Sequence, residues 1–407
     1  MNRIDNKKIR DQFPWFKNNP EYVYMDSGAT TLKPQSVIDT ITKYYEKYSS
    51  NPHNTDSKLT YQVYDEVQKV RAKLAKLLNA DTEEIAFCGG GTEGINLVAQ
   101  GIRAHLKAGD EIVLTYGEHA SNILPWMRLV DEIGVKIVYA GEMHKNPTIE
   151  DFRKVISDKT RVVSFSGGFN VTGKALNENE ITQMIKSINQ NIFVVVDAIQ
   201  CVQHRKLDTK KGGYDFLVVS AHKMFSSTGV GGIFIKKELQ PLIKPLKYGG
   251  GMNFSIKTDG YELLESVEKY EGGTPNVSGI LAWGAAIDFI NEIGYDFIRE
   301  YELQLSKYIR EQLKQIDNIE IYNDDLDSPI VAINYKGVFS QDFASYLGSK
   351  NIIVRSGLSC AKLICNILDT NSLVRVSLYV YNNFEDIDKL IKAIKEFKKE
   401  DILNGIL

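Results

Sequence analysis

Short apolar runs alternate with amphipathic stretches between Ile85 and Ile235. The runs that predict strands are Ile85–Cys88, Glu111–Tyr116, Lys136–Ala140, Arg161–Phe165, Ile192–Val196, Phe216–Ser220 and Gly232–Ile235. Apolar residues recur at helical spacing between most of them, over Glu93–Leu106, Ser121–Ile133, Thr148–Ser157 and Glu178–Ile188. This alternation predicts an α/β fold with a mainly parallel seven-stranded sheet and helices on both faces. A short Gly-rich link joins the last two runs, which favours one antiparallel edge strand or hairpin.

The second half of the chain has a different pattern. Residues Leu246–Thr274 are rich in loop formers, and a long helical pattern follows over Ser278–Ile316. A smaller strand and helix pattern comes next, over Ile330–Asn334, Gln341–Ser349, Ile352–Val354, Leu373–Ser377 and a terminal helix from about Phe384. We therefore predict a large domain over residues 20–275 and a small α+β domain over residues 276–407. The small domain is also expected to include residues 1–19.

Composition narrows the class of protein. The 407 residues are 43% hydrophobic and 25% charged, with a net charge of -3, which is typical of a soluble protein and gives no reason to expect nucleic acid as a partner. No apolar run reaches the ~18 residues of a membrane span. Residues Met1–Asp11 are polar and lack the apolar core of a secretory signal.

The four cysteines, Cys88, Cys201, Cys360 and Cys365, are too few for a disulfide framework, so we expect free thiols and a cytoplasmic protein. Cys360 and Cys365 do not have the spacing of zinc ligands, and no metal site is expected.

Two predicted strands end in residues that can bind a cofactor. The run Ile192–Val196 ends at Asp197, and the run Phe216–Val219 leads through Ser220 and His222 to Lys223. Ligands of parallel sheets bind beyond the carboxyl ends of the strands. A lysine there can form a Schiff base, and a carboxylate can keep a pyridine nitrogen protonated, so the pair points to pyridoxal 5′-phosphate (PLP).

Eight segments, in order, resemble motifs of the class V aminotransferases, which are PLP enzymes of fold type I. These segments are Tyr24–Thr31, Gly91–Asn96, Glu118–Trp126, Asp197–Gln200, His222–Lys223, Gly273–Asn276, Arg355–Ala361 and Arg375–Ser377. The resemblance covers nearly the whole chain and is strongest to the SufS-type cysteine desulfurase branch of the family.

The resemblance implies a role for each candidate residue at the cofactor. Lys223 would bind PLP and move the substrate proton, Asp197 would pair with the ring nitrogen, and Gln200 would bind the ring hydroxyl. His119 would stack on the ring and shuttle protons, because a histidine titrates near neutrality. The remaining cofactor contacts would come from Thr92, Ser220, His222 and Asn170, and from Thr274 of a neighbouring subunit in a homodimer.

Other matched residues would bind the substrate or react with it. Arg375 would bind the substrate carboxylate, with Asn170 beside it, and Arg355 would contact substrate or favour the thiolate of Cys360. Cys360 would take the substrate sulfur as a persulfide. Taken singly, each of these residues also fits a structural role: a lysine that reaches solvent, a turn aspartate or asparagine, or a buried apolar cysteine.

These assignments predict an L-cysteine desulfurase that passes sulfur to a SufE- or SufU-like acceptor, for iron–sulfur cluster assembly or tRNA thiolation. The alternatives are a selenocysteine lyase, another class V aminotransferase or lyase, and a PLP-binding scaffold that regulates a sulfur carrier. The chain departs from the family pattern at Ser27-Gly28, Asn54-Thr55, Gly337–Asp342 and Leu358-Ser359. The last two departures remove histidines found in many relatives, and they bear on acceptor docking rather than on PLP chemistry.

Overall fold

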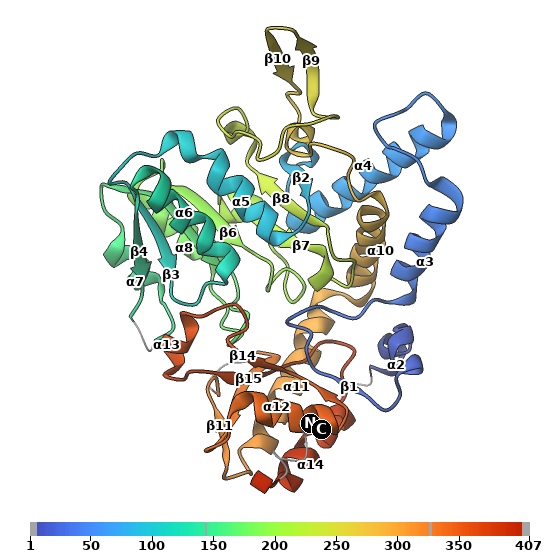
Figure 1. Ribbon diagram of the computed structural model, residues 1–407, viewed down its shortest axis with the longest axis vertical. Coiled ribbons are helices and arrows are strands. Elements are labelled where there is room, and N and C mark those ends of the chain that lie inside the picture. Colours follow the sequence, from blue (N-terminus) through green and yellow to red (C-terminus); the bar gives the residue numbers. More distant parts are fainter. Residues whose placement is uncertain (1–5, 143–144, 325–327, 401–407) are drawn as a thin grey trace.

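A computed structural model describes residues 6–142, 145–324 and 328–400, without the side chains of residues 365 and 366. Its largest element is a seven-stranded sheet in the upper part of Figure 1, with strand order β2-β8-β7-β6-β5-β3-β4. The strands are β2 (Ile85–Cys88), β3 (Glu111–Thr115), β4 (Lys136–Ala140), β5 (Thr160–Ser166), β6 (Phe193–Asp197), β7 (Phe216–Ser220) and β8 (Gly231–Ile235). Each lies within one or two residues of the predicted run, so the α/β fold with a seven-stranded sheet is confirmed.

Strand β8 is the antiparallel member, and it lies between β2 and β7. Of the two alternatives, the antiparallel hairpin of β7 and β8 is confirmed, and the position of β8 at the sheet edge is wrong. Residues 221–230 connect β7 to β8 without a crossover helix of the kind a parallel strand needs, so the chain turns back beside β7. The other edge of β8 pairs with β2, which makes β8 an interior strand.

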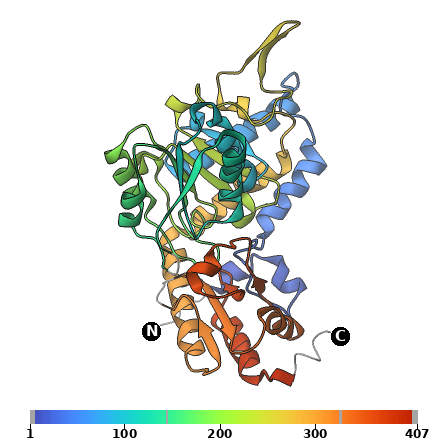
Figure 2. The same ribbon diagram turned by 60° about the vertical axis from the view of Figure 1, so that its left-hand side comes forward.

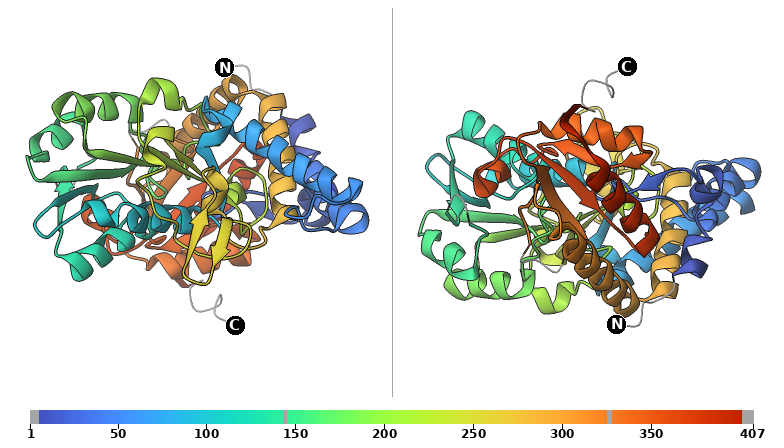
Figure 3. Two further views of the ribbon diagram at one scale, coloured as in Figure 1. Left: turned by 90° about the horizontal axis from the view of Figure 1, so that it is seen from above. Right: turned by 90° about the horizontal axis from the view of Figure 1, so that it is seen from below.

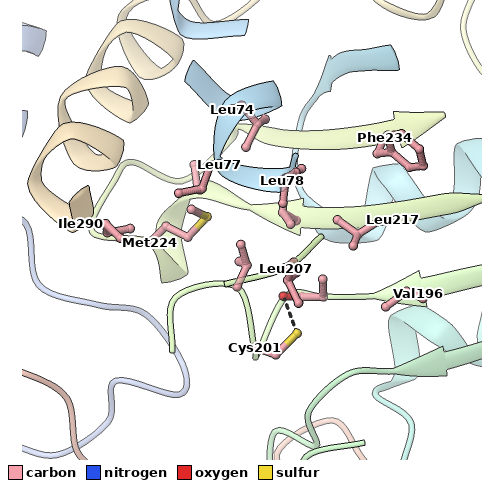
Figure 4. Packing of buried hydrophobic residues seen from close by; sticks show 14 of the residues in the cluster. Leu74, Leu77, Leu78, Val196, Cys201, Leu207, Leu217, Met224, Phe234 and Ile290 are labelled. Atoms are coloured by element: carbon pink, nitrogen blue, oxygen red, sulfur yellow. Dashed lines mark hydrogen bonds between the residues drawn. The ribbon is translucent and has the colours of Figure 1, made fainter. Parts of the chain in front are cut away.

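Both faces of the sheet are buried, because successive residues of one strand enter different cores. Val194 and Val196 belong to the apolar cluster on one face, while Val195 belongs to the cluster on the other. The first cluster, shown in part in Figure 4, includes residues of α4 (Lys58–Leu78) and α8 (Glu178–Ile188). Helices α5 (Gly91–Gly101) and α6 (Leu124–Ile133) cover the opposite face, as the views along the vertical axis show (Figure 3).

A smaller antiparallel sheet lies below the large one in Figure 1, in the order β11-β12-β15-β14. Its strands are β11 (Ile319–Ile321), β12 (Ile330–Tyr335), β14 (Arg355–Gly357) and β15 (Leu373–Ser377), and its helices are α11 (Tyr295–Leu313), α12 (Ser340–Ser349) and α14 (Phe384–Glu396). These elements share an apolar core of their own. The short strand β1 (Val23–Tyr24) pairs with β13 (Ile352–Ile353) and brings the N-terminal segment to this sheet.

The long helix predicted over Ser278–Ile316 is two helices. Helix α10 (Val277–Ile293) ends at Gly294, whose φ of +81° interrupts the helical path, and α11 begins at the next residue. Helix α10 packs on α4 and α3 (Gln35–Lys43), whereas α11 packs on α14. The proposed domain boundary between residues 275 and 276 stays a prediction.

The loop-rich segment contains a hairpin that the sequence pattern did not predict, formed by β9 (Asn253–Lys257) and β10 (Gly260–Leu263). It projects from the body of the molecule (Figures 1 and 2). The shorter helices are α1 (Lys7–Arg10), α2 (Pro14–Asn18), α7 (Ile149–Val155), α9 (Thr209–Gly212) and α13 (Ile364–Leu368). Across the described ranges, none of the helices combines the length and apolarity that a membrane crossing requires.

Candidate active site

A cavity of about 220 Å³ opens at the carboxyl ends of β5, β6 and β7. Its walls include eleven of the twelve predicted site residues: Thr92, His119, Asn170, Asp197, Gln200, Ser220, His222, Lys223, Arg355, Cys360 and Arg375. Thr274 is the exception, and it lines a separate cavity of about 130 Å³. The large sheet therefore supplies one wall and the small sheet, through Arg355 and Arg375, supplies another.

The N-terminal motif fixes the backbone that carries Lys223. Lys223 closes a single 3₁₀ turn, η5 (Ala221–Lys223), directly after β7. The carbonyl of His222 accepts hydrogen bonds from Thr31 N (3.1 Å) and Thr31 Oγ1 (3.0 Å). Burial, followed by the nearby charge of Arg375, lowers the pKa of the Lys223 amine to about 8. A larger share of the amine is therefore neutral near pH 7 than for an ordinary lysine.

Asp197 is the last residue of β6 and is buried. Its Oδ1 accepts a hydrogen bond from Ile199 N at 3.1 Å, which holds the carboxylate at the strand end. Burial raises the pKa of the Asp197 carboxyl to about 6, although Lys223 and the Ile199 amide oppose the rise. A buried carboxylate with one hydrogen bond is strongly stabilised by a cationic partner.

His119 caps the short helix η4 (Ala120–Asn122), and its Nδ1 accepts a hydrogen bond from Ser121 N at 3.1 Å. The proton of the neutral ring then resides on Nε2. The prediction that this histidine titrates near neutrality is wrong: burial, then Lys223 and Arg375, lower the pKa of His119 to about 4. His119 is a neutral imidazole at pH 7, with an N–H that can donate.

Glu118, the residue before His119, is buried at the centre of a polar network that was not predicted. The Glu118 carboxylate accepts from Thr115 Oγ1 (2.6 Å), Ser166 Oγ (2.6 Å), Ser166 N (3.1 Å) and Asn122 Nδ2 (2.8 Å). Asn122 Oδ1 in turn accepts from Trp126 Nε1 at 3.1 Å. Burial raises the pKa of the Glu118 carboxyl to about 7 even with these donors. The sequence feature that could have pointed to this network is the Glu118-His119 pair of the matched motif.

Arg375 lies on β15 and is almost completely buried. Its Nη2 donates to Asp26 Oδ1 at 2.7 Å and its Nη1 donates to the carbonyl of Asn170 at 2.9 Å. Gly28 permits this position, because a Cβ on residue 28 would lie 3.0 Å from Arg375 Cζ. The antiparallel register places Arg355 of β14 directly across from Arg375. The two guanidinium groups make this side of the cavity suited to an anion.

Cys360 is exposed and lies in the loop that follows β14. Its carbonyl accepts from Ala120 N at 2.8 Å, next to His119 in the chain. Cys201 is buried, as expected of a core residue, and Cys88 is half-buried. Burial raises the pKa of both these thiols to about 12, so neither is suited to react as a thiolate. The side chain of Cys365 lies outside the described residues.

The remaining end of the cavity can accept a phosphate. Gly90 precedes α5 with a φ of +141°, and Gly91 and Thr92 line the cavity at the start of the helix, where backbone amides have no intrahelical partner. Thr92 Oγ1 lies 2.7 Å from Ser121 Oγ, a second hydroxyl that the sequence argument did not single out. Ser220 lies on the same cavity wall.

The unpaired polar atoms of the described residues also fit a cofactor. Among those residues, Asn170 Oδ1, Gln200 Oε1, His222 Nδ1, Ser359 Oγ and Arg375 Nε are buried without a hydrogen-bond partner, and all five residues line the cavity. Gln200 uses only its Nε2, which donates to the Gly28 carbonyl at 2.8 Å. Buried polar groups are rarely left unpaired, so this cluster fits a polar ligand such as PLP and its substrate.

Comparison with known proteins assigns the chain to a class of enzymes. The Aminotransferase class-V family matches residues 23–390, and the chain belongs to that family, whose members depend on PLP. A probable cysteine desulfurase of Ureaplasma parvum is 54% identical, over 97% of this chain and 98% of that protein. A probable cysteine desulfurase of Mycoplasma pneumoniae is 36% identical, over 98% of each chain.

Solved structures of cysteine desulfurases have the same fold. The enzyme of Thermococcus onnurineus superposes with a TM-score of 0.91 at 32% identity, over 97% of this chain and 98% of that chain. An Escherichia coli cysteine desulfurase, in an S-sulfonic acid form, superposes with a TM-score of 0.90 at 28% identity, over 99% of each chain. The family and fold type expected from the motifs are therefore confirmed.

Proposed function

We propose that this protein is a PLP-dependent cysteine desulfurase, which converts L-cysteine to L-alanine and retains the sulfur as a persulfide on Cys360. The observation that supports this most is the position of Cys360. It is an exposed thiol on the wall of the cavity that also holds Lys223 and Arg375. A nucleophile, a Schiff-base lysine and a carboxylate-binding arginine around one cavity suit sulfur removal from an amino acid.

PLP, when bound, supplies an electron sink for the substrate carbon atoms. Lys223 would bind it, and Asp197 would pair with the ring nitrogen. The lowered pKa of Lys223 favours a neutral amine that can accept the substrate Cα proton. His119, neutral and with its proton on Nε2, would cover the ring and donate a hydrogen bond through that N–H. Arg375 would bind the substrate carboxylate through the N–H groups that Asp26 and Asn170 leave free.

The sulfur transfer balances without an added oxidant. The Cys360 thiolate attacks the substrate sulfur, an S–S bond forms, and the carbon–sulfur bond breaks with its electron pair retained on the substrate carbon. That carbon then takes a proton, so L-cysteine and a thiol become L-alanine and a persulfide. A reducing compartment such as the cytoplasm suits this chemistry because the reaction needs a free thiol at Cys360.

We further propose that the active enzyme is a homodimer in which Thr274 completes the phosphate site of the partner. Thr274 lines a cavity separate from the one that holds Lys223. The neighbouring hairpin exposes Phe254 and Ile256, at 74% and 73% of their surfaces, and Tyr261 at 61%. A projecting apolar hairpin is suited to contact another subunit. The expected sulfur acceptor is a SufE- or SufU-like protein, in iron–sulfur cluster assembly or tRNA thiolation.

The desulfurase proposal is tested by incubating the PLP-loaded protein with L-cysteine and measuring alanine, with Cys360→Ala beside it. Loss of alanine formation in Cys360→Ala supports the proposal. Undiminished alanine formation by this variant would contradict it. The same assay with L-selenocysteine identifies a selenocysteine lyase if only that substrate yields alanine independently of Cys360.

The dimer proposal is tested by mixing two weak variants, Lys223→Ala and Thr274→Ala. In a mixed dimer, one site has Lys223 from the second variant and Thr274 from the first. Activity above that of either variant alone is expected after the subunits exchange. No recovery, with exchange shown by mass, would mean that Thr274 does not act across subunits.

A further inference from the structure

Asn170 contacts both the nucleophile loop and the arginine that faces the substrate. It lies in the loop after β5 and is buried, with 5% of its surface exposed. Its side-chain Nδ2 donates to the carbonyl of Ser359 at 2.8 Å. Its backbone carbonyl accepts from Arg375 Nη1 at 2.9 Å. One residue therefore joins the residue before Cys360 to the Arg375 guanidinium.

The loop that Asn170 contacts has a strained backbone. Ser359 and Cys360 have φ values of +46° and +59°, so two consecutive residues with side chains are in the left-handed region. Such a conformation persists only where its surroundings fix it. Two donors fix it here: Asn170 Nδ2 binds the Ser359 carbonyl, and Ala120 N binds the Cys360 carbonyl at 2.8 Å.

Arg375 connects this loop to the substrate position. Its Nη1 is bound to Asn170 and its Nη2 to Asp26, while its buried Nε has no partner among the described residues. A carboxylate that binds this guanidinium adds a further restraint to an orientation that Asp26 and Asn170 already set. Because Nη1 also donates to the Asn170 carbonyl, the same event restrains Asn170 and, through its amide, the Ser359 carbonyl.

We propose that Asn170 is a positioning residue for the nucleophile: it holds the strained Cys360 loop against the cavity and tightens that hold when Arg375 binds a carboxylate. The inference rests on the proposed role of Cys360 in sulfur transfer. The position of the loop, however, can be measured without any sulfur chemistry.

The test measures the rate at which iodoacetamide alkylates Cys360 in the PLP-loaded protein. The reaction is monitored through the mass of the Cys360 peptide. Asn170→Ala is expected to raise this rate about fivefold, the effect of losing one hydrogen bond. Asn177→Ala is the matched control, because Asn177 also lies between β5 and α8 but caps α8 instead. An equal rate in Asn170→Ala and the native protein would overturn the proposal, as would an equal acceleration by Asn177→Ala.

A second arm uses only the native protein and needs no variant to fold. L-Alanine carries an amine and a carboxylate, whereas ethylamine carries the amine alone. Saturating L-alanine is expected to slow alkylation of Cys360 severalfold, and ethylamine is expected to leave the rate near its starting value. Equal slowing by both compounds would overturn the coupling through Arg375. If the desulfurase assay fails but both alkylation experiments give the expected rates, only the proposed function is disproved.

Discussion

Arg375 Nη2 lies 2.7 Å from Asp26 Oδ1, and this ion pair joins the start of the chain to the last strand of the small sheet. The arginine side chain is 2% exposed and the aspartate side chain 16%. A guanidinium so deeply buried needs a fixed partner, because an unpaired buried charge is costly. Asp26 therefore holds in position the guanidinium that we propose to bind the substrate carboxylate.

Removal of that partner is expected to weaken substrate binding and stability together. Asp26→Ala leaves the Arg375 charge buried and unpaired, at a cost of about 3 kcal/mol. We expect a rise of tenfold or more in the KM for L-cysteine and a lower Tm. Steady-state alanine formation and thermal unfolding measure the two effects. Asp131→Ala, an exposed aspartate of α6, is the control and is expected to change neither quantity. An unchanged KM in Asp26→Ala would show that Arg375 is positioned by other groups.

Cofactor affinity is expected to fall as the pH falls through about 6. Burial raises the pKa of Asp197 to about 6, so the carboxyl becomes protonated below that pH and loses its attraction for a pyridinium. Equilibrium binding of PLP to the apoprotein, measured by absorbance between pH 5 and pH 8, tests this. Asp197→Asn is expected to bind PLP weakly at every pH. If native affinity is flat across this range, Asp197 does not pair with the ring nitrogen.

The rate of cofactor attachment is expected to depend on a different group. Schiff-base formation needs a neutral amine, and burial lowers the pKa of Lys223 to about 8. The rate of appearance of the visible absorbance should therefore rise between pH 7 and pH 9 and level off above it. A midpoint near the ordinary lysine pKa of ~10.4 would contradict the buried environment of Lys223. Lys223→Ala should give none of this absorbance at any pH.

The network around Glu118 is expected to stabilise the fold around the seven-stranded sheet. Glu118→Ala leaves the Thr115, Ser166 and Asn122 donors without their acceptor, which should lower the free energy of unfolding by about 3 kcal/mol. Thermal unfolding of the PLP-loaded protein measures the loss. Glu83→Ala, which removes an exposed carboxylate, should leave the Tm unchanged. A similar Tm for Glu118→Ala and the native protein would mean that water replaces the lost acceptor.

The sequence pattern predicted the large sheet well because its strands are buried on both faces. Residues such as Val194, Val195 and Val196 form continuous apolar runs, which define a strand without knowledge of its neighbours. The hairpin β9–β10 was missed for the opposite reason. It is mostly exposed, so its residues show no apolar face toward a core. The break between α10 and α11 was missed because it depends on one residue, Gly294, at a positive φ.

Residues that line the cavity were predicted where a motif and a strand end coincide, as at Asp197 and Lys223. Asp26 and Glu118 were not assigned roles, although both lie in the matched motifs, because their partners are set by tertiary structure. Asp26 accepts a hydrogen bond from Arg375, which lies near the other end of the chain. Glu118 accepts one from Ser166, which lies on β5. The low pKa of His119 likewise arises from burial and from Lys223 and Arg375, which local sequence does not reveal.

One measurement tests directly whether Cys360 receives the substrate sulfur. The PLP-loaded protein is given one equivalent of L-cysteine and then quenched with an alkylating agent. After digestion, the mass of the Cys360 peptide is measured. We expect this peptide to gain the mass of one sulfur atom while an equal amount of alanine appears. Alanine formed with no sulfur on Cys360, or with the sulfur on Cys88 or Cys201 instead, would contradict it.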